Sequence, residues 1–204
     1  MVAAATLHAF STELLIGSMT FAVTATLLRL VATFSGLFTD NIRKGLDQAA
    51  FFASLFALAA IPLVILTGNF AAENNSISPM IVNKVLLSGL CLGLWVGVVH
   101  GRWTWGPELW SRKGTALFHS AITCAAYGVA AMLGSIGGLL TRGETVGDLL
   151  GFWPHFGSAP ELGYGLSITL ALLSLVTLLT VIFIQPRGEP IEDGSGRIAE
   201  SLDQ

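Results

Sequence analysis

Five long runs of apolar residues decide what this chain can fold into. A bilayer core about 30 Å thick is crossed by roughly 20 helical residues, so each run is long enough to span it. We therefore predict an all-α fold, an integral membrane five-helix bundle. The predicted spans lie near residues 8–34, 48–70, 81–101, 115–140 and 162–185.

The composition agrees with burial of nearly the whole chain in lipid. Of the 204 residues, 53% are hydrophobic and only 11% are charged, whereas a soluble domain carries about 25% charged residues. The net charge of −3 excludes a basic nucleic-acid-binding surface. We therefore expect the lipid bilayer and other membrane subunits as partners, and no nucleic acid.

Basic residues gather in alternate connections between the predicted helices. The first connection contains Arg43 and Lys44, and the third contains Arg102, Arg112 and Lys113. The second connection has no Lys or Arg, and the fourth has a single arginine. Because cytoplasmic loops carry an excess of Lys and Arg, we predict the N-terminus outside and the C-terminus in the cytoplasm. The expected location is a bacterial inner (cytoplasmic) membrane.

The same pattern divides the chain into two regions. Residues 1–185 are predicted to form the transmembrane domain, whose first helix is retained because its apolar run exceeds that of a signal peptide. Residues 186–204 are rich in proline, glycine and acidic residues, so we expect a flexible cytoplasmic tail.

Two of the four histidines fall at similar depth on neighbouring predicted helices. His100 ends the helix near 81–101, and His119 comes about one turn into the helix near 115–140. Two imidazoles at one depth are what a haem iron requires for axial ligation from two helices. His100 and His119 are therefore the predicted metal ligands of a haem b.

Small residues lie along the same helix faces as these histidines. At about 100° per residue, Gly89, Gly93 and Gly97 fall within about 60° of His100. A flat macrocycle needs such a recess, which makes the glycines predicted cofactor-binding residues. Small-residue stripes also let helices pack closely in lipid, and this second interpretation stays open. The corresponding stripe below His119 contains Thr123, Ala126, Ala130 and Gly137, of which Ala126 is the predicted cofactor contact.

The other two histidines lie on the predicted outer side. His8 opens the first helix and His155 lies in the segment WPHFG. They either ligate a second haem, or His8 forms a hydrogen bond at a helix end and His155 is solvated. Glu13 is expected to pair with Lys84, or alternatively to contact a proton or a quinol.

Aromatic and basic residues near the predicted helix ends are expected at the membrane surface. Trp103, Trp105 and Trp110 on the inner side and Trp153 on the outer side fit an interfacial aromatic belt. Arg29 is expected to extend to the headgroups.

The sequence contains no phosphate-binding loop, HExxH motif, nucleophile elbow or zinc-spaced Cys/His cluster. Independent catalysis by this chain is therefore not expected. At most it is an electron-transfer subunit of an oxidoreductase.

Three segments stand out: LHAFSTELLIG in the first helix, ALAAIPLVILTG in the second and GSIGGLLTRGE at the end of the fourth. They resemble an uncharacterised bacterial family of four-helix membrane domains with a histidine-led first helix. The resemblance covers about residues 7–144 and implies a four-helix architecture, with the helix near 162–185 as an addition.

The histidines at helix ends are also similar in general mode to membrane-anchor cytochrome b subunits of respiratory oxidoreductases. That resemblance implies haem b held by His100 and His119, with electron exchange to quinone and a partner protein. The leading hypothesis is a b-type haem-binding, electron-transferring subunit of a larger complex. The alternatives are a cofactor-free accessory subunit that packs against catalytic or pigment-binding chains, and binding of another tetrapyrrole through the same histidines.

Overall fold

The structure, a computed structural model, describes residues 4–71, 79–145, 148 and 172. The chain divides into two compact units, Met1–Ala159 and Pro160–Gln204, and every described residue except Leu172 belongs to the first. The helix predicted near 162–185 and the tail 186–204 lie outside the described residues, apart from Leu172.

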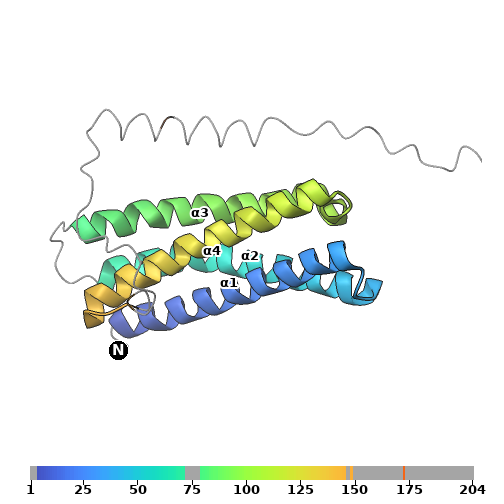
Figure 1. Cartoon of the computed structure of the whole chain (residues 1–204). Helices are drawn as coiled ribbons and strands as arrows, with labels where there is room; N and C mark the ends of the chain where they lie inside the picture. Colours follow the sequence, from blue (N-terminus) through green and yellow to red (C-terminus); the bar gives the residue numbers. More distant parts are fainter. Residues whose placement is uncertain (1–3, 72–78, 146–147, 149–171, 173–204) are drawn as a thin grey trace, which may run out of the picture. The chain divides into compact units, whose positions relative to one another are not determined.

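Within residues 4–71 and 79–145 the chain forms four long α-helices and one short 3-10 helix (Figure 1). Each long helix has the length and apolar composition needed to cross a membrane, so the chain is an all-α integral membrane protein. The helices are α1 (Ala4–Ser35), α2 (Asp40–Ala71), α3 (Pro79–Trp105) and α4 (Lys113–Arg142), and η1 (Gly106–Trp110) joins α3 to α4.

All four helices extend beyond the predicted apolar spans. The largest difference is at α2, which begins at Asp40 although its apolar run begins near residue 48. Hydropathy marks only the part of a helix that lies in hydrocarbon, whereas backbone hydrogen bonding continues through polar turns. The polar first two turns of α2 consequently bring Arg43 and Asp47 into the helical bundle.

The helices pack in an up-and-down bundle. Helix α1 packs against α2 and α4, and α3 packs against α2 and α4, so each helix has two neighbours. Gly36 adopts a positive φ of 68° in the short connection from α1 to α2, a conformation that glycine tolerates without strain. Gly143 (φ 75°) ends α4, and its N–H donates to the Leu139 carbonyl, which closes the last turn.

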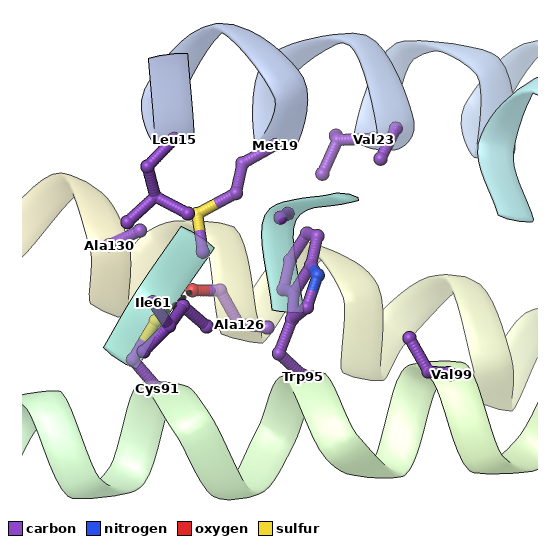
Figure 2. Close-up of a cluster of buried hydrophobic side chains, with 11 residues drawn as sticks. Leu15, Met19, Val23, Ile61, Cys91, Trp95, Val99, Ala126 and Ala130 are labelled. Atoms are coloured by element: carbon purple, nitrogen blue, oxygen red, sulfur yellow. Dashed lines mark hydrogen bonds between the residues drawn. The ribbon is translucent and has the colours of Figure 1, made fainter. Parts of the chain in front are cut away.

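The centre of the bundle is built around Trp95 of α3, which is fully buried (Figure 2). Ala22 of α1, Ala57 of α2 and Ala126 of α4 are also fully buried and leave room for the indole ring. The indole N–H donates to the Ser54 carbonyl at 2.9 Å. One large ring among three methyl groups therefore holds all four helices at close distance. The same cluster also contains Leu15, Met19, Val23, Ile61, Cys91, Val99 and Ala130.

Large aromatic side chains project from the outside of the bundle. Such exposure is unfavourable in water and favourable in hydrocarbon, which agrees with a lipid-facing surface. The phenylalanines that are more than half exposed are Phe10, Phe21, Phe52, Phe56, Phe70 and Phe118.

Gly138 of α4 provides a test of this packing. It is buried, and a Cβ added there would lie 2.7 Å from the Glu144 carbonyl oxygen. Gly138→Ala therefore forces the backbone after α4 to move, and we expect the free energy of unfolding in detergent to fall by about 1–3 kcal/mol.

Gly93→Ala is the matched control, because nothing lies within 4 Å of a Cβ at Gly93. Equal unfolding midpoints for the two variants would contradict the packing described around Gly138.

Candidate functional site

A buried carboxylate lies at the end of the bundle where α1 joins α2 and α3 joins α4. Asp47 of α2 is only 6% exposed. Arg102 of α3 donates from Nε to Oδ1 at 2.7 Å and from Nη2 to Oδ2 at 2.5 Å. Trp110 of η1 donates from Nε1 to the same Oδ1 at 2.7 Å. Both carboxylate oxygens are thus bonded, which is what burial of a charge requires.

Trp110 extends this arrangement to the remaining two helices. The His119 ring of α4 contacts it edge-on, with 5.8 Å between ring centroids and an angle of 85°. The guanidinium carbon of Arg29 in α1 lies 5.0 Å from the Trp110 ring centroid, within the range of a cation–π contact. We call Arg29, Asp47, Arg102, Trp110 and His119 the Asp47 cluster.

The local chain path explains why Trp110 reaches this position. Gly106, with a positive φ of 56°, turns the chain after α3, and Pro107 starts the single turn of η1. Trp110 is the last residue of that turn and is 4% exposed. The prediction of Trp110 as an interfacial anchor is therefore wrong, whereas Trp103 and Trp105 are exposed as that prediction requires.

The space inside the Asp47 cluster is small. The cavity there measures about 10 Å³ and is lined by polar atoms of Thr26, Asp47, Arg102 and His119 among others. That volume is close to what one water molecule needs, and it is far below the volume of a porphyrin. The interior at this end therefore has no room for a macrocycle.

The two histidines predicted to share a haem occupy different surroundings. His119 is 8% exposed, and a Cβ on Gly101 of α3 would lie 3.9 Å from its Nδ1. His100, the preceding residue on α3, is exposed, and its Nε2 lies 3.3 Å from the Thr104 hydroxyl. Consecutive helical residues point about 100° apart, so the face of α3 that meets His119 is not the face that bears His100. The structure does not bring the two rings together in one gap between helices.

The two small-residue stripes are separated in the same way. Gly89, Gly93 and Gly97 are exposed, and a Cβ at any of them would meet no other atom within 4 Å. They form an open strip on the outside of α3 with His100 at its end, which we call the glycine face. On α4, by contrast, Thr123, Ala126 and Ala130 are buried in the core. The α4 stripe thus serves helix packing.

At the opposite end of the bundle, His8 takes part in a polar contact between α1 and α2. Its Nδ1 lies 3.2 Å from the Thr67 hydroxyl, which is also 3.1 Å from the Ser11 hydroxyl. Gly68 permits this approach, because a Cβ there would be 2.9 Å from the His8 ring. The structure thus shows the hydrogen-bonding alternative for His8, while His155 lies outside the described residues.

The expected pairing of Glu13 with Lys84 is wrong. Among the described residues Glu13 forms no ion pair, and it lies exposed in an open groove beside Phe10 and Phe56, whereas Lys84 lies near Gly137. Arg29 stacks on Trp110 and donates from Nη1 to Thr33 at 2.8 Å, so part of its guanidinium group is held by the bundle.

Sequence reasoning missed Asp47, because it was read as part of a polar connection. A usable signal was its spacing from the buried residues Ala50, Ser54, Ala57 and Ile61 of the same helix. Positions three, seven, ten and fourteen residues on share a helix face with Asp47, which therefore continues the core stripe of α2.

Comparison with known protein families, with curated proteins and with solved structures found no match to this chain.

Asp47→Asn tests the energetic importance of the Asp47 cluster. It leaves the Arg102 guanidinium, whose side chain is 14% exposed, without a counter-charge. We expect the free energy of unfolding in detergent to fall by about 3–5 kcal/mol, as for other broken buried ion pairs.

Asp40→Asn is the matched control. Asp40 is 87% exposed and lies 3.7 Å from Arg43, so its loss should change stability little. A similar small effect of both substitutions would show that the Asp47 cluster does not hold the bundle together.

Proposed function

We propose that this protein is a membrane-embedded, b-type haem-binding electron-transfer subunit of a larger redox complex, in which His100 would hold the haem. The observation that carries the proposal is an exposed imidazole at the end of the open glycine face of an apolar helix. Polar and ionisable groups in the lipid-facing part of a membrane helix are costly and commonly have a functional partner.

The described residues fit a macrocycle on the outside of the bundle and not within it. The interior cavity near His119 has a volume of about 10 Å³. The glycine face has open space above three successive turns, where a bulky side chain would obstruct a flat ring. We therefore assign haem contact to His100, Gly97 and Gly93, and we assign His119 to the bundle interior.

The single exposed histidine among the described residues explains why a partner subunit would be needed to hold the haem. Among the described histidines only His100 is exposed, and no three His, Cys, Asp or Glu side chains of the described residues come together to hold a bare metal ion. A haem iron needs only one or two protein ligands, because the porphyrin supplies four. His100 would hold the haem from this chain, and a neighbouring subunit would supply any further protein ligand.

When bound, the haem would supply one-electron chemistry. The chain's own residues would hold and orient it. His100 would hold the haem, and Thr104, whose hydroxyl lies 3.3 Å from His100 Nε2, would lie beside it one turn along α3. The Asp47 cluster would fix the end of α3 that bears His100, because Arg102 lies two residues farther along the same helix.

The absorption spectrum of the purified chain, with a pyridine haemochrome assay, tests this proposal. We expect a Soret band that His100→Ala removes and that His119→Ala keeps. Gly93→Leu should also remove the band, because its side chain fills the space over α3, while circular dichroism shows a native helix content.

Three results would contradict the haem proposal. They are a colourless native chain, retention of the Soret band in His100→Ala, and retention of it in Gly93→Leu. A chlorophyll-type spectrum in place of haem would instead identify another tetrapyrrole on the same face.

The second candidate is a cofactor-free accessory subunit that packs against catalytic or pigment-binding chains. The same glycine face supports it, because glycines at every fourth position let two membrane helices approach closely. This candidate differs from the first in two observable respects. It predicts that the native chain is colourless, and that Gly93→Leu releases the chain from its complex without unfolding it.

We further propose the predicted topology, with five spans, the N-terminus outside and the C-terminus in the cytoplasm of a bacterial inner membrane. The charges of the described helix ends support this orientation. The end that contains the Asp47 cluster carries six basic residues, Arg29, Arg43, Lys44, Arg102, Arg112 and Lys113. Such an excess is typical of the cytoplasmic side.

Alkaline phosphatase fusions in a bacterial host test this topology, because the enzyme is active only outside the cytoplasm. A fusion after Ala71 should be active, and fusions after Ser111 and after Gln204 should be inactive. Activity after Gln204 would contradict the fifth span, and activity after Ser111 would contradict the orientation.

A further inference from the structure

Three cationic side chains surround the turn between α1 and α2. Arg29 of α1 and Arg43 of α2 are near enough for their charges to repel, and Arg43 Nη2 lies 4.0 Å from the position of a Cβ on Gly36. Lys113 of α4 lies 5.4 Å from the ring centroid of Phe34, which is in the last turn of α1. Three cationic side chains thus lie around the end of α1 and the start of α2, and two of them repel each other.

Acceptors within the described residues satisfy these cations only in part, since Arg29 Nη1 donates to Thr33 at 2.8 Å. The Nε atoms of Arg29 and Arg43 are buried and have no hydrogen-bond partner there. Asp47 attracts Arg29, but hydrogen bonds from Arg102 and Trp110 already occupy both of its oxygens. Asp40 approaches Arg43 only to 3.7 Å and is 87% exposed. A buried donor without an acceptor costs free energy, so this arrangement favours an added anion.

The surroundings of the three cations are apolar and face outward. Phe34 is 47% exposed and Leu37 is 76% exposed, both next to the turn. Over the described residues, six basic and three acidic residues lie at this end of the bundle, which gives it a net charge of +3. The acidic residues are Asp40, Asp47 and Glu108.

We propose that Arg29, Arg43 and Lys113 bind the phosphate of an anionic phospholipid. A guanidinium group binds phosphate oxygens through its planar set of N–H donors, and the two arginines present such groups from adjacent helices. Phe34 and Leu37 lie where the acyl chains of a bound lipid would pack. The position at the end of two membrane-spanning helices favours a lipid headgroup over a free phosphate. This inference shares only Arg29 of the Asp47 cluster with the haem proposal and does not depend on that proposal.

Native mass spectrometry of the full chain, purified in mild detergent with added lipid, tests the proposal. We expect bound phosphatidylglycerol to exceed bound phosphatidylcholine severalfold. Arg43→Gln should lower phosphatidylglycerol retention about fivefold. The double variant Arg29→Gln/Arg43→Gln should reduce it to the phosphatidylcholine value.

Lys44→Gln is the matched control, because it removes the same charge from the exposed neighbouring position. It should leave retention unchanged. Arg29→Gln also alters the contact with Trp110, so circular dichroism must show native helix content, and Arg43→Gln alone remains a sufficient test.

Three outcomes would overturn the proposal. Equal retention of the two lipids would show no anionic site. An equal loss in Lys44→Gln and Arg43→Gln would show only general surface charge. Displacement of phosphatidylglycerol by millimolar inorganic phosphate would identify a site for a free anion.

Discussion

The charge of Asp47, buried in an otherwise apolar bundle, imposes the arrangement of one whole end of the molecule. A carboxylate in such surroundings must be neutralised and hydrogen-bonded, because its desolvation is otherwise too costly. Arg102 and Trp110 supply these bonds and thereby fix the end of α3 and the turn of η1. Trp110 then provides the surface against which Arg29 of α1 and His119 of α4 pack. The ion pair and the ring contacts of Trp110 consequently link all four described helices.

The described interior is too closely packed for a large ligand, so the proposed ligands would bind at the outer surface. Trp95 and the alanines around it fill the centre, and the cavity in the Asp47 cluster is as small as one water molecule. The open features of the described chain lie on outer faces, where His100 ends the glycine face and Arg43 lies beside the first turn. Both proposed sites therefore lie on the outer surface of the bundle.

The positions of His100, His119 and Trp110 show how much of the candidate site could be predicted from the sequence. Matched depth placed His100 and His119 at the same end of the bundle, and the structure agrees with that. Depth is a distance along a helix, however, and says nothing about rotation around its axis. The rotation of α3 puts Gly101 opposite His119 and leaves His100 outside. Trp110 was similarly placed at the membrane surface by its position, although a turn at Gly106 carries it inside.

The amino-acid sequence alone is enough to predict an integral membrane protein, the four described spans and the end at which basic residues gather. These follow from hydrophobic length and from charge counts, which are properties of a segment taken alone. The buried face of each helix is visible only in the packed bundle. Helices in lipid are apolar on all sides, so hydrophobic periodicity does not mark the buried face, and packing of small residues around Trp95 does. The pairing of Asp47 with Arg102, 55 residues apart, depends on that same rotation.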